Sequence, residues 1–275
     1  MSTLQKKYRL LQDLLGSYGK VAIAYSGGVD SSLLSYVAHE TLGDNAVSLT
    51  ADAPVVPRSE FVDSQAFCKR YSIRQVICHP NPIMMEEVRF NAPNRCYVCK
   101  KVIFGSLLEE AAKLGVETIA DGSNLDDLGD YRPGLKALEE LQVKSPLREA
   151  GFTKADIRAL SRELGLPTWS KQSNACLATR FPYGTEITAE KLSLVDKAEG
   201  ALSGMGFTQL RVRVHNDIAR IEVPAEQIET LLRDENRTSI VDALKELGFA
   251  YVTLDLAGYR TGSMNEKLGT VPSNA

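Results

Sequence analysis

The chain has 275 residues, of which 44% are hydrophobic and 24% charged, so it can hold one α/β core and a smaller second domain. The formal net charge of -3 excludes a global positive field, which disfavours bulk nucleic-acid binding. The N-terminus lacks the apolar core of a signal peptide, and no run approaches the ~18 apolar residues of a membrane span. We therefore expect a cytoplasmic protein whose five cysteines are thiols or ligands rather than disulfides.

Short β-branched runs alternate with helical patterns over the first 165 residues, which is typical of a parallel sheet with helices on both faces. The predicted strands are residues 21–25, 46–50, 73–77 and 117–120. Polar loops follow three of them directly, at residues 26–31, 52–54 and 121–124. Because ligands bind at the carboxyl ends of strands in such folds, we expect these loops to face a ligand.

The pattern changes in the last third of the chain. A capping box at residues 153–156 starts a predicted helix, and a loop then runs to about residue 183. From about residue 187 the order is helix, strand, strand, helix, helix, strand. We predict a doubly wound, Rossmann-like α/β domain over residues 1–185. A smaller α+β domain over residues 186–275 is expected to contribute to substrate binding and is a candidate for oligomerisation.

The loop after the first strand has the features of a phosphate cradle. Its glycines allow close approach of an oxyanion, its serines donate hydrogen bonds, and the backbone amides belong to a helix N-terminus. The string is Ser26-Gly27-Gly28-Val29-Asp30-Ser31-Ser32. A carboxylate at Asp30 would repel phosphate unless a divalent cation lay between them, and Mg²⁺ bound to ATP supplies that cation. A tight turn with a good N-cap is the plainer alternative, which a string of this length makes unlikely.

Two later loops are predicted to complete the nucleotide site. Asp52 follows the second predicted strand, and Asp121 with Gly122 follows the fourth. An ordinary Asx-rich turn explains the second of these loops equally well from its local pattern.

Three cysteines are candidates for sulfur chemistry. Cys96 and Cys99 begin a predicted helix beside cationic residues, which favours thiolates, although a redox dithiol, half a zinc site and incidental cysteines all fit the spacing. A structural zinc site needs four ligands, and the three histidines are scattered along the sequence without ligand spacing. Cys176 lies in a polar loop next to Arg180, so we expect it to be reactive or ligating rather than a packed hydrophobe.

Arginines alternate with apolar residues on a predicted strand of the second domain. Leu210, Val212 and Val214 are expected to face a core, which leaves Arg211 and Arg213 on the other face. Their stems leave the strand ~6.6 Å apart, a spacing that suits two guanidinium forks on one phosphate. A solvated strand face is an equally good interpretation of the pattern. Arg180 and Arg260 are weaker candidates for substrate binding.

Several strings resemble known proteins. The loop at residues 26–31 is similar to the pyrophosphate loop (PP-loop) of the N-type ATP pyrophosphatases, which cleave ATP between its α and β phosphates. From about residue 20 to 265 the chain resembles the LarE family, the sulfurtransferases of nickel-pincer nucleotide synthesis for lactate racemase. The strings that carry this likeness are residues 130–137, 172–184, 211–222 and 251–256.

The resemblance implies that a carboxylate of pyridinium-3,5-biscarboxylic acid mononucleotide is adenylated and becomes a thiocarboxylate, with AMP and pyrophosphate released. Some members take sulfur from the cysteine matching Cys176, which becomes dehydroalanine. Those members have other residues at the positions of Cys96 and Cys99. In this respect the chain resembles the family's iron–sulfur form, in which three thiolates hold a [4Fe–4S] cluster with one open iron. Cys176 is then a cluster ligand, sulfide or another donor supplies the sulfur, and the family implies a homo-oligomer.

Three other functions are compatible with parts of the sequence. Thiolation of a transfer-RNA base would keep the chemistry, but the chain lacks a basic stripe. An ammonia-dependent amide ligase would not need the three cysteines. A non-catalytic ATP-binding regulatory module would bind ATP without releasing AMP.

Overall fold

The computed structural model describes residues 2–129, 133–172 and 174–260. The chain forms two compact units. One comprises Met1–Val88 and Pro93–Asn174, and the other comprises Arg89–Ala92 and the chain from Ala175 onward. The domain division at residue 185 stays a prediction, because compactness alone does not define a folding domain.

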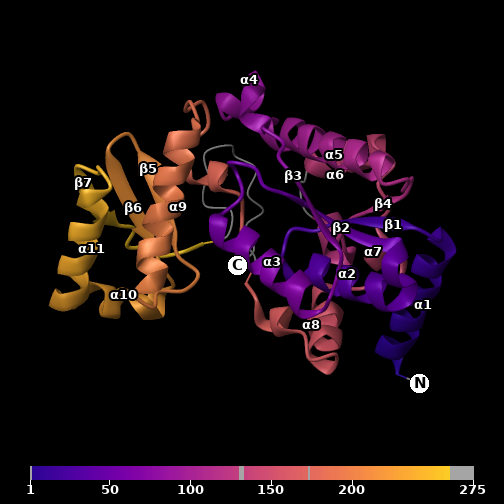
Figure 1. The fold of residues 1–275 in the computed structure, drawn as a ribbon. Coiled ribbons are helices and arrows are strands. Elements are labelled where there is room, and N and C mark those ends of the chain that lie inside the picture. Colours follow the sequence, from indigo (N-terminus) through magenta and orange to yellow (C-terminus); the bar gives the residue numbers. More distant parts are fainter. Residues whose placement is uncertain (1, 130–132, 173, 261–275) are drawn as a thin grey trace. The chain divides into compact units, whose positions relative to one another are not determined.

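The first unit is built on a parallel sheet (Figure 1). Its strands are β1 (Val21–Ala24), β2 (Ala46–Ala51), β3 (Gln75–Cys78) and β4 (Ile119–Ala120), in the order β3-β2-β1-β4. All pair in parallel, which confirms the predicted α/β fold and places each of the four predicted strands to within about two residues. Because β4 pairs with β1, the loops that follow these two strands leave the same edge of the sheet side by side.

Helices cover both faces of this sheet. The side chains of β1 alternate, so Val21 and Ile23 join one hydrophobic core while Ala22 joins the other. The helix α2 packs on one face with α1 and α8 against it, and α5 covers the opposite face beside α6. The helices of this part of the chain are α1 (Thr3–Tyr18), α2 (Val29–Leu42), α3 (Arg58–Arg70), α4 (Glu86–Arg89), α5 (Arg95–Lys113), α6 (Pro133–Glu140), α7 (Pro146–Glu149) and α8 (Lys154–Glu163). No helix in the described ranges has the length and apolarity that crossing a membrane requires.

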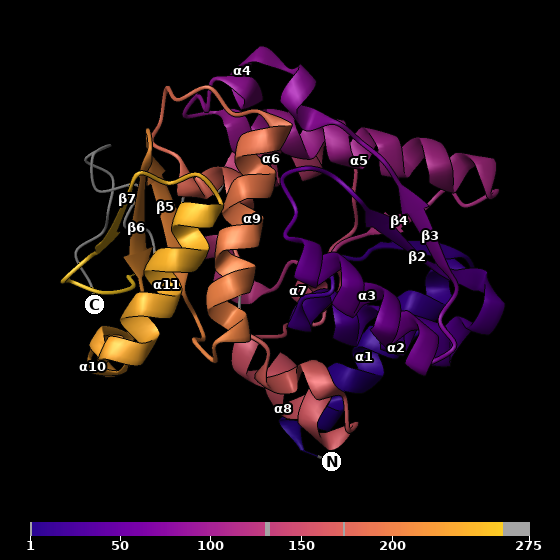
Figure 2. The same ribbon diagram turned by 60° about the vertical axis from the view of Figure 1, so that its left-hand side comes forward.

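The second unit is a small α+β structure. Its sheet pairs β5 (Arg211–His215) with β6 (Ile218–Glu222) antiparallel and β6 with β7 (Tyr251–Leu254) parallel. Its helices are α9 (Ala189–Gly204), α10 (Ala225–Leu232) and α11 (Asp234–Glu246), of which α9 and α11 lie on one face of the sheet (Figure 2). Asn216, with a φ of 57°, supplies the left-handed residue of the tight β5–β6 turn. The order helix, strand, strand, helix, helix, strand that was predicted from about residue 187 is confirmed.

Candidate functional site

The loop after β1 opens directly into a helix N-terminus. The helix α2 begins at Val29, and Gly28 is its N-cap with φ −75° and ψ 166°. Asp30 and Ser31 therefore lie in the first helical turn, whose N–H groups have no partner within the helix. This geometry concentrates amide donors and the positive end of the helix dipole where an anion can bind.

Gly27 allows the loop to pass close to α3. Its φ is +78°, a conformation that side chains disfavour. A Cβ at this position would lie 3.0 Å from the carbonyl oxygen of Glu60 and 3.2 Å from Cβ of Ser64. A glycine is thus required here by both backbone conformation and space.

Serine hydroxyls close the loop on itself. The Oγ atoms of Ser26 and Ser31 are 3.1 Å apart, and the backbone N–H of Ser26 donates to Oγ of Ser31 over 3.3 Å. Ser32 is fully buried beneath the loop, 3.4 Å from the hydroxyl of Tyr25. Burial raises the pKa of the Tyr25 phenol, which therefore stays neutral at this position.

The loop after β4 packs against the start of α2. A Cβ on Gly122 would lie 3.0 Å from the backbone nitrogen of Ser31 and 3.2 Å from Cβ of Asp30, so the two predicted loops do meet. Asp121 is buried, and its carboxylate accepts hydrogen bonds from the hydroxyls of Ser123 and Ser145, the latter over 2.8 Å. These contacts fix Asp121 within the protein, and its role as an ATP ligand stays a prediction.

The carboxylate of Asp30 is held by two side chains. Asn124, from the β4 loop, donates from Nδ2 to Oδ1 over 3.4 Å, and the ammonium of Lys154 forms an ion pair with Oδ2. Lys154 is the first residue of α8, which Thr153 and Asp156 begin with the predicted capping box. Its backbone N–H donates to Asp126 over 2.7 Å, which ties α8 to the β4 loop.

Sequence reasoning missed Lys154. It predicted the helix start at Thr153, but Lys154 lies 124 residues from Asp30 in the chain, so local pattern contained no signal for the ion pair. The protein itself thus supplies a cation to Asp30, in addition to any metal that arrives with the nucleotide.

Asp52 lies at the end of β2, where the sequence placed it. Its backbone N–H donates to the carbonyl of Cys78 over 2.8 Å. Its carboxylate faces Arg58 at 3.2 Å and Nδ1 of His79 at 3.5 Å. A contact of Asp52 with ATP stays a prediction.

The CxxC cysteines occupy the first turn of α5. Cys96 is exposed and Cys99 is half-buried, one helical turn apart near the positive end of the dipole. The hydroxyl of Tyr97 and the ammonium of Lys101 bond to Glu140 of α6, at 2.7 Å and 2.6 Å, and hold this turn in place. Within the described ranges, no three His, Cys, Asp or Glu side chains gather as a metal site requires.

The remaining cysteines separate into packing and loop residues. Cys68 and Cys78 are buried, and burial raises the pKa of the Cys68 thiol to about 12. Cys176 is half-buried in the second unit and precedes a 3₁₀ turn, Leu177–Arg180. Cys96 and Cys99 belong to the first unit.

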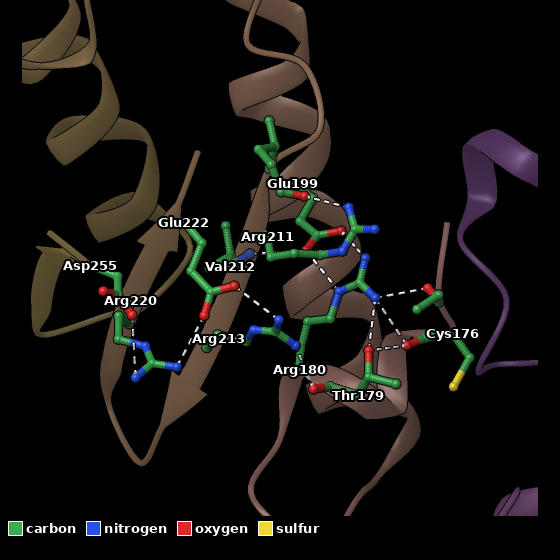
Figure 3. A network of polar contacts seen from close by, with 12 residues as sticks. Cys176, Thr179, Arg180, Glu199, Arg211, Val212, Arg213, Arg220, Glu222 and Asp255 are labelled. Atoms are coloured by element: carbon green, nitrogen blue, oxygen red, sulfur yellow. Dashed lines mark hydrogen bonds and ion pairs between the residues drawn. The ribbon is translucent and has the colours of Figure 1, made fainter. Parts of the chain in front are cut away.

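Arg180 anchors the backbone around Cys176 (Figure 3). Its side chain is fully buried, and Nε and Nη2 pair with the two carboxylate oxygens of Glu199 at 2.9 Å and 2.8 Å. Its Nη1 donates to the carbonyl oxygens of Ala175 and Cys176, at 2.7 Å and 3.1 Å. These contacts indicate a positioning role, while direct binding of substrate by Arg180 stays a prediction.

The arginines of β5 are buried rather than solvated. Val212, between them, is fully buried as predicted, but Arg211 and Arg213 are only 4% and 5% exposed, so the alternative of a solvated strand face is wrong. Arg213 pairs with the buried Glu222 at 2.9 Å and donates to the carbonyl of Thr179 over 2.8 Å. Burial, reinforced by nearby Arg180, lowers the pKa of Arg211.

Comparison with known proteins decides the family. A protein of Lactiplantibacillus plantarum named pyridinium-3,5-bisthiocarboxylic acid mononucleotide synthase is 38% identical over 269 residues, which are 98% of this chain and 97% of that protein. The chain belongs to the LarE family. No family model matches it.

Two further relatives place the LarE family in context. An uncharacterized protein of Synechocystis is 42% identical to this chain over 96% of it and 99% of the relative. One subunit of a glutamine-hydrolysing GMP synthase from Thermoplasma volcanium is 31% identical over 64% of this LarE chain and 61% of its own length. The predicted membership in the PP-loop superfamily is confirmed.

Proposed function

We propose that this LarE-family chain is an ATP-dependent sulfurtransferase acting on pyridinium-3,5-biscarboxylic acid mononucleotide. It adenylates a carboxylate of that substrate and converts it to a thiocarboxylate for nickel-pincer cofactor synthesis. The observation that carries the proposal is the match, over nearly the whole of both chains, to the protein named as a synthase of the bisthiocarboxylic product.

The nucleotide site supports ATP cleavage between the α and β phosphates. The amides from Gly27 to Ser31 are proposed to bind the leaving pyrophosphate, and the loop lacks the lysine of a γ-phosphate-binding loop. Asp30 would share Mg²⁺ with ATP, and Lys154 would then turn from the Asp30 carboxylate to the phosphate oxygens. Asp52, Asp121 and Gly122 complete the proposed nucleotide site.

The substrate site is proposed on the second unit. Arg211 and Arg213 bind the mononucleotide phosphate, with Arg180 and Arg260 as secondary candidates. Burial of Arg211 and Arg213 supports this proposal, because a cation oriented by surrounding protein loses less entropy on binding than a flexible surface side chain.

Sulfur transfer completes the reaction. The sulfur of hydrosulfide bonds to the acyl carbon of the adenylate, the bond from that carbon to the phosphate oxygen breaks, and AMP leaves with the electron pair. The remaining S–H proton passes to solvent. Hydrosulfide, or another sulfur donor, is therefore a required co-substrate.

We propose that Cys96, Cys99 and Cys176 hold a [4Fe–4S] cluster. Cys96 and Cys99 suit thiolate ligation because they are accessible and share one helical turn at a dipole end that favours anions. Bound there, the cluster would supply an iron able to hold hydrosulfide. The alternative is that Cys176 donates its own sulfur and becomes dehydroalanine.

Turnover with Mg²⁺-ATP tests the reaction. The expected products are AMP, pyrophosphate and a thiocarboxylate, detected by chromatography and mass spectrometry. Release of ADP and phosphate would refute the proposal. An amide formed with ammonia would instead indicate a ligase, thiolated transfer RNA a base-modifying enzyme, and ATP binding without AMP a regulatory module.

Anaerobic reconstitution tests the sulfur source. With a cluster, Cys96→Ala and Cys99→Ala should each lose iron and activity together, and the wild-type mass should persist through repeated turnover. With Cys176 as donor, both variants should complete one transfer and the wild type should lose the mass of H₂S. Light scattering tests the homo-oligomer that we also propose, and a monomeric mass would contradict it.

A further inference from the structure

Glu60, the third residue of α3, contacts two segments with different roles. Its backbone carbonyl lies against Gly27 of the pyrophosphate loop, at 3.0 Å from the position a Cβ would occupy. Its side-chain carboxylate accepts hydrogen bonds from Lys171 over 2.9 Å and from Asn174 over 2.7 Å. One buried residue therefore contacts the loop as well as Lys171 and Asn174.

Lys171 and Asn174 lie just before Cys176 in the chain. Asn174 precedes Cys176 by two residues, so the backbone of Cys176 can lie no more than about 7 Å from that of Asn174. Lys171 is held a second time by Asp63, at 2.8 Å, and is only 17% exposed. Lys171 and Asn174 are thus both held to α3 by side-chain contacts.

We propose that Glu60 is a positioning residue that couples the pyrophosphate loop to Lys171 and Asn174, which precede Cys176 in the chain. The inference deepens the proposed function and rests on it. The acyl-adenylate forms at the loop and must meet sulfur before water reaches it. Anchoring Asn174 on the residue that contacts Gly27 restrains the chain that enters Cys176 during that interval.

Loss of the anchor has a defined chemical consequence. Water oxygen would bond to the acyl carbon of the adenylate, the bond from that carbon to phosphate would break, and the products would be the starting carboxylate and AMP. ATP would then be consumed without thiocarboxylate formation. The ratio of AMP released to thiocarboxylate formed therefore measures the coupling.

Glu60→Gln in the full-length enzyme is the test. The substitution preserves size and the backbone contact with Gly27, but it removes the charge that pairs with Lys171 and weakens the bond to Asn174. We expect the AMP-to-thiocarboxylate ratio to rise about tenfold, the scale of one hydrogen bond to a charged group. The rate of pyrophosphate release should change much less, because the backbone contact with Gly27 is preserved.

Asp63→Asn is the matched control. Asp63 is the other carboxylate partner of Lys171, it is 60% exposed, and it makes no contact with Asn174 in the described structure. Its replacement should leave the ratio unchanged, because an ion pair with so exposed a carboxylate contributes little and Glu60 still holds both Lys171 and Asn174. A Glu60→Gln enzyme with the wild-type ratio, or with pyrophosphate and thiocarboxylate falling in parallel, would overturn the inference.

A second readout does not depend on activity. In metal-free protein, iodoacetamide should modify the half-buried Cys176 about tenfold faster in Glu60→Gln than in wild type, because the preceding segment has lost its charged anchor. Asp63→Asn should react at the wild-type rate. An unchanged alkylation rate contradicts the anchor itself, whereas a wild-type enzyme that makes no AMP or no thiocarboxylate contradicts the proposed function.

Discussion

Replacing Lys154 by methionine should separate metal binding from ATP turnover. In the structure the Lys154 ammonium pairs with the carboxylate of Asp30. Methionine preserves the apolar stem and removes the charge. Because Lys154 and Mg²⁺ compete for Asp30, the variant should bind Mg²⁺ more tightly in the absence of ATP. It should turn over ATP more slowly, because no ammonium remains to meet the phosphates.

The structure sets the size of the effect. Two unit charges ~4 Å apart interact by about 4 kcal/mol at an effective dielectric constant near 20, before any desolvation cost. The side chains of Lys154 and Asp30 are 35% and 22% exposed, so solvent screens part of this energy. A hydrogen bond to a charged group contributes ~1.5–3 kcal/mol. We therefore expect kcat/KM for ATP to fall by about 10- to 150-fold.

The assay measures pyrophosphate release at saturating substrate together with Mg²⁺ binding by calorimetry. Lys7→Met is the matched control. Lys7 forms an ion pair at 2.7 Å with Asp156, which lies on α8 like Lys154, and the side chains of Lys7 and Asp156 are 24% and 26% exposed. That variant should lose some stability and keep its kinetic constants. If Lys154→Met matched Lys7→Met in both measurements, the assignment of Lys154 to the nucleotide site would be wrong.

Further predictions concern the loop, the β5 arginine pair and the cysteines. Gly27→Ala should lose pyrophosphate release and ~1–3 kcal/mol of stability in denaturant titration, whereas Gly28→Ala, with negative φ and its nearest neighbour at 3.5 Å, should be nearly as stable as wild type. Arg213→Met should cost about 3 kcal/mol of unfolding free energy because it leaves a fully buried carboxylate with one fewer partner, and an unchanged denaturation midpoint would contradict this. At pH 8 in metal-free native protein, iodoacetamide should modify Cys96 and spare Cys68, because the raised pKa of Cys68 keeps its thiol protonated. Detection by mass spectrometry of alkylated Cys68 in the native protein would refute the assignment.

The parts of the fold that depend on local pattern were predictable. The four parallel strands follow from short β-branched runs, and the start of α8 follows from the capping box at Thr153 and Asp156. The helix N-terminus predicted at the glycine-serine loop is confirmed, with Gly28 as the N-cap of α2. Local propensity and capping act over a few residues, so their signals are present in the sequence itself.

The sequence by itself determined the glycine-serine loop after a buried strand, the alternation of Arg211 and Arg213 with apolar residues, and the family strings. Only the tertiary structure decided which charges meet. The pairings of Lys154 with Asp30, of Arg213 with Glu222, and of Arg180 with Glu199 all join different elements. A charged residue carries no local mark of its partner, because the pairing energy depends on distance and burial, which exist only after the elements have packed.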